Sequence, residues 1–221
     1  MQNIVFGSYP EVVLTDDKRS VATNLAIDYL LKDILQLGLI RDPETIRRLI
    51  SLIARQIGSV VSINELANTL NISRSTVERY LNLLEQTYVI FRLPAYSTNP
   101  RKELTKSQKI FFWDTGIRNA VVGEFSMDKS RADIGPLWEN WVIAEVAKHN
   151  LINGSINQLF FWRARDGSEV DMVLKNDDKM KALEIKWSNT GGKNKAFRDA
   201  YNIDVQNINR FNPLSIQEFV Q

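Results

Sequence analysis

The sequence predicts an α+β fold in two parts, a helical domain over residues 1–122 and an α/β domain over residues 123–221. Capping residues and apolar spacing over Ser62–Tyr88 predict two helices joined by a short turn. Turn residues divide Phe160–Trp187 into three segments with strand-like patterns. Residues 123–135 contain few large apolar side chains, so this stretch is the predicted boundary.

Composition narrows the class of protein. The 221 residues suffice for one large or two small domains, and 44% hydrophobic with 24% charged residues is typical of a soluble globular chain. No apolar run approaches the roughly 20 residues that span a bilayer, and no signal peptide is evident. The absence of cysteine and the single His149 exclude disulfides, cysteine-ligated zinc and multi-histidine metal sites. We therefore expect a cytoplasmic protein without a membrane partner.

The first half of the chain begins with a short segment and two predicted helices. Residues 1–13 read as a leader or as the remnant of a preceding domain. Apolar residues at helical spacing predict a helix over Ser20–Leu37, which Gly38 ends. A second helix begins at Asp42-Pro43, with proline at its first position, and ends near Gly58.

The next stretch resembles a winged helix-turn-helix. Ser62 caps one predicted helix, with Glu65 three residues later as a capping box, and Ser73 caps the second helix. Strand-like segments at Val89–Leu93 and Lys109–Trp113 then form a two-stranded wing.

Such a winged helix would bind DNA through the exposed face of its second helix and through the basic segment between the wing strands. The alternative is a protein-interaction or structural role for the same fold. The predicted nucleic-acid-binding residues are Arg74, Ser75, Arg79, Arg101, Lys102 and Lys106.

The second half begins with a predicted helix over Pro136–Asn150. Glu139 projects near the apolar edge of this helix, where a carboxylate needs a partner or a metal ion. The helix is followed by predicted strands at Leu159–Arg163, Glu169–Leu174 and Lys181–Trp187. A short helix at Lys195–Tyr201 and final strands at Ile203–Val205 and Phe219–Val220 complete the domain.

Three polar residues on the last two of these three strands form a candidate site. If the strands pair antiparallel, Asp171 and Glu184 come together, with Lys186 one step along. Two neighbouring carboxylates repel unless a cation lies between them, and Mg²⁺ or Mn²⁺ prefers such oxygen ligands. Lys186 would then orient or deprotonate an attacking water. The alternative is the polar outer face of a hairpin, with Lys186 as a cross-strand partner of the carboxylates.

Asp171, followed by Glu184-Ile185-Lys186 on the next strand, resembles the core motif of the PD-(D/E)xK nuclease superfamily, which includes Holliday-junction resolvases and many restriction enzymes. This resemblance implies a restriction-endonuclease-like α/β domain in the C-terminal half. It also implies that Glu139 joins Asp171 and Glu184 as a metal ligand, because members carry a glutamate on the helix before the first strand.

The chain as a whole resembles the uncharacterised C-terminal region that follows the ATPase module in a group of prokaryotic AAA-type ATPases. This resemblance implies a cognate ATPase module in the same native chain. No GxxxxGK[ST] motif is present, so ATP would bind only through that absent module. The matching segments, besides Asp33 and Glu139-Asn140, are Gly7–Val13, Phe112–Ile117, Phe161–Arg163, Glu169–Asp171 and Glu184–Lys186.

Together these patterns predict the DNA-associated C-terminal module of an AAA-type ATPase, with a metal-dependent deoxyribonuclease site. Lys186, Glu184 and Asp171 would be catalytic. The alternative is a catalytically inactive regulatory, protein-interaction or oligomerisation module, in which Glu169 joins the same residues in a structural charge network. A homo-oligomer is a further expectation.

Overall fold

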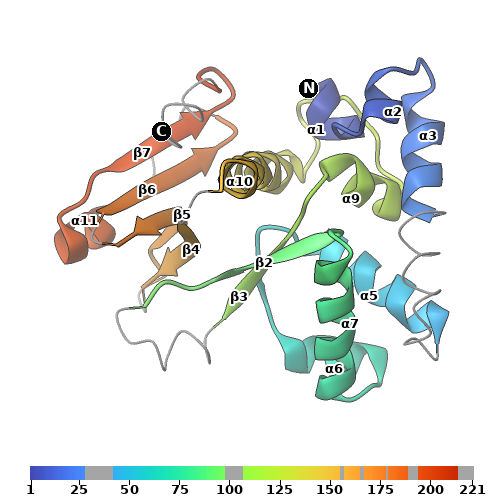
Figure 1. The fold of residues 1–221 in the computed structure, drawn as a ribbon, viewed down its shortest axis with the longest axis horizontal. Helices are drawn as coiled ribbons and strands as arrows, with labels where there is room; N and C mark the ends of the chain where they lie inside the picture. Colours follow the sequence, from blue (N-terminus) through green and yellow to red (C-terminus); the bar gives the residue numbers. More distant parts are fainter. Residues whose placement is uncertain are drawn as a thin grey trace. The chain divides into compact units, whose positions relative to one another are not determined.

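The computed structural model has a mixed α+β fold with two small sheets, which confirms the predicted fold class (Figure 1). The chain divides into two compact units: Met1–Arg92 with Ile110–Arg131, and Leu93–Lys109 with Ala132–Gln221. The structure describes residues 1–27, 42–97, 107–154, 157–164, 167–177, 179–188 and 194–213.

The chain passes from one unit to the other more than once. It leaves the first unit after Arg92 and returns at Ile110, so residues 93–109 fall with the second unit. Both passages lie inside strands, β2 (Ile90–Pro94) and β3 (Gln108–Phe112). The final passage follows Arg131, inside the stretch predicted as a boundary loop.

Seven helices are described in the first unit. Helix α5 begins at Pro43, as predicted, and Asp42 caps it by accepting hydrogen bonds from the backbone N–H groups of Glu44 and Thr45. Ile4 and Val5 are buried and α1 packs against α9, so residues 1–13 are part of this unit and not a loose leader. The helices are α1 (Gln2–Phe6), α2 (Pro10–Val13), α3 (Lys18–Asn24), α5 (Pro43–Arg55), α6 (Ile63–Leu70), α7 (Arg74–Gln86) and α9 (Thr115–Val122). The later part of the helix predicted from Ser20, residues 28–37, lies outside the described residues.

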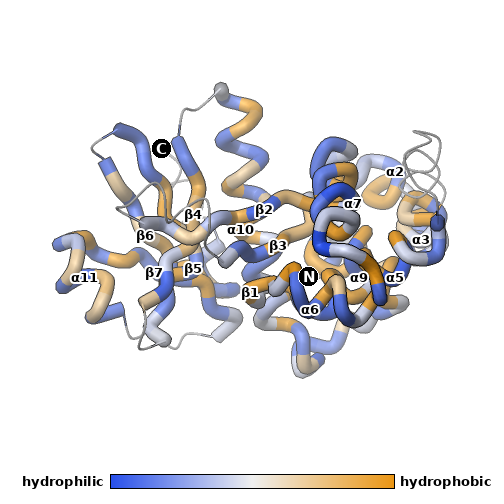
Figure 2. Tube along the Cα trace, turned by 90° about the horizontal axis from the view of Figure 1, so that it is seen from below, coloured by the Kyte–Doolittle hydropathy of each residue, from blue (hydrophilic) through white to orange (hydrophobic). Residues whose placement is uncertain are grey.

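Helices α6 and α7 begin at the predicted caps. The Ser62 hydroxyl accepts from the Glu65 N–H at 3.3 Å, and the Ser73 hydroxyl accepts from the Thr76 N–H at 3.1 Å. Polar and apolar stretches alternate along α7 (Figure 2), as expected of a helix with one buried face. A short strand that the sequence did not predict, β1 (Val60–Val61), joins β3 and β2 in a sheet of order β1-β3-β2.

The Asp114 carboxylate forms hydrogen bonds with two segments of the first unit that are distant in sequence, one at Ser8 and one at Gly116. One oxygen accepts from the N–H of Gly116 at 2.8 Å and caps α9, while the other accepts from the N–H of Ser8 at 2.7 Å. Gly7 has a positive φ of 86°, and a Cβ there would overlap the Asp114 carboxylate. A Cβ at Gly116 would overlap the backbone carbonyl of Phe6. Both glycines are therefore required for this close approach.

The second unit holds a four-stranded sheet of order β4-β5-β6-β7, in which the first two pairings are antiparallel and the last is parallel. Its apolar core includes Phe160, Trp162, Val173 and Phe197. The predicted strand at 219–220 lies outside the described residues. The elements are α10 (Ile134–Ile152), β4 (Gln158–Arg163), β5 (Glu169–Asn176), β6 (Lys179–Lys186), α11 (Lys195–Tyr201) and β7 (Val205–Asn209).

No helix in the part of the chain that the structure describes has both the length and the apolar character needed to span a bilayer.

Candidate functional site

The antiparallel pairing of β5 with β6 sets the position of the first two candidate residues. The last pair of the ladder is Met172 with Leu183, so Asp171 and Glu184 stand opposite each other one step beyond it. At this position the backbone N–H of Ile185 donates a hydrogen bond to a side chain, because Asp171 Oδ2 accepts it at 2.7 Å. The backbone of β6 therefore fixes one carboxylate beside the other.

Lys186 joins this pair from the end of β6. Its Nζ lies 2.5 Å from Glu184 Oε1 and 3.5 Å from Asp171 Oδ2, and 41% of its side chain is exposed. Glu184 is buried, and its Oε2 has no hydrogen-bond partner among the described residues. The structure thus brings Asp171, Glu184 and Lys186 together; their chemical roles remain predictions.

A buried lysine that sequence reasoning missed lies in the same unit. Lys109 is 1% exposed, and its Nζ lies 2.9 Å from Glu139 Oε1 and 2.5 Å from Glu169 Oε1. The ammonium also lies 5.5 Å from the centroid of the Phe161 ring. The sequence feature that could have indicated a buried lysine is its position directly before the apolar run Ile110–Phe112. From the sequence, Lys109 is predicted only to start a wing strand.

We call the six residues Lys109, Glu139, Glu169, Asp171, Glu184 and Lys186 the acidic cluster. It contains four carboxylates and two ammonium groups, and a third cation, Arg163, lies 3.8 Å from Glu169 with its side chain 51% exposed. With every group ionised, negative charge is in excess. The cluster therefore favours a proton or a further cation.

The pKa values of the cluster follow from burial and from this charge excess. Burial and the charge of Asp171 raise the pKa of Glu139 to about 8, although Lys109 opposes the shift. Burial also raises the pKa of both Asp171 and Glu184, against the effect of Lys186. Burial alone would lower the pKa of Lys109 and of Lys186, but the surrounding carboxylates raise both. Each lysine is therefore held in its charged form.

Asp171 and Glu184 suit a single hard divalent cation. Mg²⁺ is commonly bound through one or two carboxylates and keeps several waters, so these two side chains suffice. The unpartnered Oε2 of Glu184 supplies a free oxygen ligand. Glu139 contacts Lys109 instead, and no group of three acidic or histidine side chains within the described ranges is arranged to hold an ion. The role of Glu139 as a metal ligand therefore stays a prediction.

The predicted nucleic-acid-binding residues fall into two groups. Arg74, Ser75 and Arg79 are exposed on α7. The Ser75 hydroxyl lies 2.8 Å from that of Ser73, and the Arg79 guanidinium lies 5.3 Å from the ring centroid of Tyr80. Arg101, Lys102 and Lys106 lie outside the described residues.

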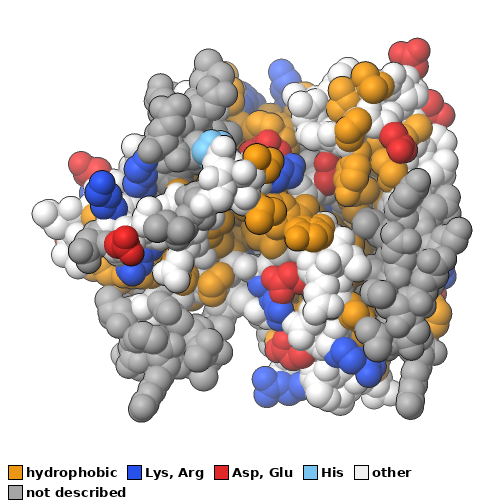
Figure 3. Space-filling model, in the orientation of Figure 1, with side chains coloured by type: hydrophobic (Ala, Val, Ile, Leu, Met, Phe, Trp, Pro, Cys, Tyr) orange, Lys and Arg blue, Asp and Glu red, His pale blue; other side chains and the backbone are white. Residues whose placement is uncertain are grey.

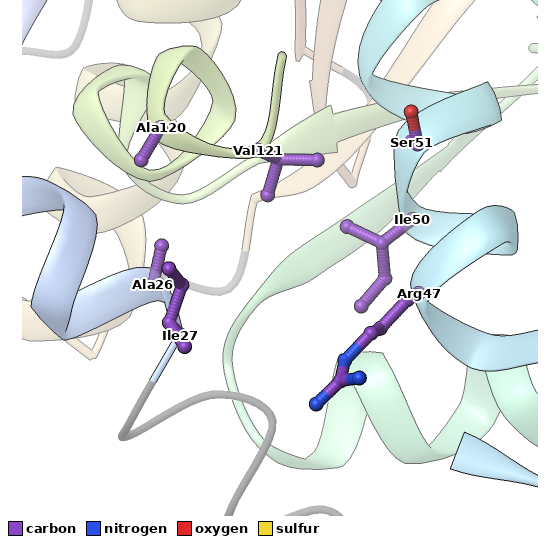
Figure 4. A pocket seen from close by; sticks show the side chains of 7 residues that line it. All are labelled: Ala26, Ile27, Arg47, Ile50, Ser51, Ala120 and Val121. Carbon is purple, nitrogen blue, oxygen red and sulfur yellow. The ribbon is translucent and has the colours of Figure 1, made fainter. Parts of the chain in front are cut away.

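A pocket of about 210 Å³ lies in the first unit and does not involve the acidic cluster. Its lining is mainly apolar, with Arg47 as the charged member (Figure 4). None of the predicted site residues lines it. The lining residues are Ala26, Ile27, Arg47, Ile50, Ser51, Ala120 and Val121.

Comparison with known proteins gives two family matches. Residues 1–128 match the domain of unknown function DUF8612, and residues 134–213 match the domain of unknown function DUF4143. No solved structure matches the chain.

Three similar proteins carry the name "uncharacterized protein". One from Mycobacterium bovis and one from Mycobacterium tuberculosis are each 28% identical over 181 residues, which is 80% of this chain and 40% of theirs. One from Haemophilus influenzae is 23% identical over 187 residues, which is 81% of this chain and 44% of its own. The chain therefore spans less than half the length of these relatives.

Proposed function

This chain belongs to the family of the domain of unknown function DUF8612, and from that premise we propose that it is the DNA-associated module of a longer AAA-type ATPase, with a Mg²⁺-dependent deoxyribonuclease site. The family resemblance of the motifs supports the ATPase link. The length of the relatives supports it too, because more than half of each lies outside the matched region and leaves room for an ATPase module.

The hydrolytic site consists of Asp171, Glu184 and Lys186. The observation that carries this assignment is the buried, unpartnered Oε2 of Glu184 beside a carboxylate that the N–H of Ile185 holds in place. The order of α10, β4, β5, β6, α11 and β7 is compatible with the restriction-endonuclease-like domain that the motifs imply.

Each residue has a distinct task in phosphodiester hydrolysis. Asp171 and Glu184 would hold Mg²⁺ or Mn²⁺, and such an ion would supply Lewis-acid polarisation of the phosphate and of the attacking water. Lys186 orients the attacking water and offsets the negative charge that develops on the phosphate. Water adds to phosphorus and one ester P–O bond breaks. One proton of the water ends on the departing sugar hydroxyl and the other on solvent.

Titration with Mn²⁺ tests the metal site directly. The parent protein should bind one ion at Asp171 and Glu184, and Asp171→Asn should abolish that binding, because the amide lacks the charge. Affinity should fall as pH is lowered, since protons compete for carboxylates whose pKa values are raised. Isothermal titration calorimetry measures both effects.

Glu145→Gln is the matched control for this titration. Glu145 is an acidic residue of α10 that pairs with Lys148 at 2.7 Å and is not part of the acidic cluster. Its replacement should leave Mn²⁺ binding unchanged. Equal binding by Asp171→Asn and the parent would eliminate the assigned site.

The first unit contributes DNA affinity in this proposal. The order α5, β1, α6, α7, β2, β3 and the sheet order β1-β3-β2 support a winged helix-turn-helix. Arg74 and Arg79 are exposed on α7, the second helix of this motif, where they suit phosphate contacts. Basic and acidic side chains are interspersed on the face drawn in Figure 3.

Binding to duplex and branched DNA should therefore weaken steeply as salt is raised, because phosphate contacts release counterions. Arg74→Ala and Arg79→Ala should each lower the salt dependence by about one unit of log–log slope. Arg47→Ala, an exposed arginine of α5, is the control and should change neither affinity nor slope. Fluorescence anisotropy at several salt concentrations measures this, and salt-insensitive binding would favour a protein-interaction role.

The second candidate is an inactive regulatory, protein-interaction or oligomerisation module. It is favoured by one observation: both lysines of the acidic cluster already pair with carboxylates, as in a structural charge network. This candidate predicts no Mn²⁺ binding by the parent protein and no cleavage of any DNA. The titration above therefore distinguishes the two.

A further inference from the structure

Two carboxylates from different elements converge on one buried point. Glu139 lies on α10 and Glu169 begins β5, yet one oxygen of each lies within 2.9 Å of the same atom, Lys109 Nζ. The Lys109 side chain is 2% exposed, whereas 15% of the Glu139 and 27% of the Glu169 side chain remain exposed. The point of convergence is therefore buried, while a part of each glutamate side chain remains exposed.

This arrangement supplies part of what a hard cation needs. Mg²⁺ is commonly bound through one or two carboxylates and keeps several waters, so two convergent carboxylate oxygens could serve as its protein ligands. The atom at the point of convergence carries a positive charge. Lys109 thus does for Glu139 and Glu169 what a metal ion would do.

We propose that Lys109 is a built-in counter-ion that fills a second divalent-cation site of the acidic cluster. The parent protein then takes a single metal ion, at Asp171 and Glu184, and Glu139 acts as a partner of Lys109. The assignment of that single ion rests on the proposed function. The second site, at Glu139 and Glu169, becomes available to Mg²⁺ or Mn²⁺ only when the ammonium is removed.

Lys109→Met opens the second site with little change in shape. Methionine has an unbranched side chain one atom shorter than that of lysine, so it retains the apolar stem and leaves the Nζ position vacant. Without metal, Glu139 and Glu169 then face each other with no cation between them. The melting temperature in EDTA should fall by about 10 °C, as expected when one partner of a buried ion pair is lost.

Mn²⁺ should recover most of this loss, and the number of bound Mn²⁺ ions should rise from one in the parent to two in Lys109→Met. In a Glu184→Gln background, which removes the first site, no ion should bind while Lys109 is retained, and one should bind once Lys109→Met is added. Mn²⁺ binding in the Glu184→Gln background therefore tests the second site at Glu139 and Glu169 separately from the first site at Asp171 and Glu184. If the parent binds no ion but Lys109→Met binds one, the proposed function fails and the counter-ion role stands.

Two further variants keep the test decisive. Lys109→Arg retains the charge and should bind no additional ion. Lys109→Met combined with Glu139→Gln removes one ligand and one negative charge, so it should melt near the parent temperature in EDTA and should bind no more Mn²⁺ than the parent does. If Lys109→Met folds only with Mn²⁺ present, the proposal is supported. If its melting temperature is equally low with Mn²⁺ and with EDTA, Lys109 is only a structural ion-pair partner and the proposal is wrong.

Discussion

Lys186→Ala should lower Mg²⁺-dependent DNA cleavage by about 100-fold or more while the melting temperature hardly moves. Loss of one group that stabilises developing transition-state charge typically has an effect of this size. We expect a smaller structural contribution from this side chain than from the buried Lys109, because 41% of it is exposed, although its partner Glu184 is buried. A large kinetic effect with little thermal effect would therefore identify a chemical role.

Lys148→Ala is the control for this experiment. Lys148 is a lysine of α10 with 30% of its side chain exposed, and it pairs with Glu145 at 2.7 Å. Its loss removes one partly exposed ion pair and should leave cleavage unchanged. The substrates should include branched and single-stranded DNA, and the cognate ATPase module should be restored. If Lys186→Ala cleaves as well as the parent, another site or a contaminant is responsible; if neither cleaves, the regulatory role is the better explanation.

Gly116→Ala should destabilise the first unit by about 3 kcal/mol or more, the upper part of the range for an overpacked site. The added Cβ would overlap the carbonyl of Phe6, a backbone atom that cannot rotate away. Relief requires α1 to move from α9, which would also break the bond from the Ser8 N–H to Asp114. Urea denaturation followed by circular dichroism measures the loss.

Gly135→Ala is the matched control, since it is the same substitution in a helix where a Cβ would meet nothing within 4 Å. Alanine favours a helix over glycine by up to about 1 kcal/mol, so stability should stay equal or rise. Equal, small effects for the two variants would contradict the close approach of residues 6–7 and 114–116.

The sequence predicts those features that depend on neighbouring residues. Capping by Ser62 and Ser73 is predictable because each cap and its backbone donor lie within three residues. The meeting of Asp171 with Glu184 is visible because alternation along two consecutive strands places both side chains on one face.

Contacts between distant residues could not be predicted from those patterns. Lys109 and Glu139 are 30 residues apart, and the Ser8 N–H and Asp114 are 106 apart, so no local periodicity links them. For the same reason the sequence predicts a leader or the remnant of a preceding domain at residues 1–13, although Ile4 and Val5 are buried and α1 packs against α9, which follows much later.

Lys109 and its two glutamate partners lie in different family segments of the chain. The two family matches meet between residues 128 and 134. Lys109 lies on the first side of that junction, whereas Glu139 and Glu169 lie on the second. A gene fusion there would give the second segment an unrelated neighbour and leave two carboxylates without their cation. Selection should therefore keep the two segments together as one evolutionary unit.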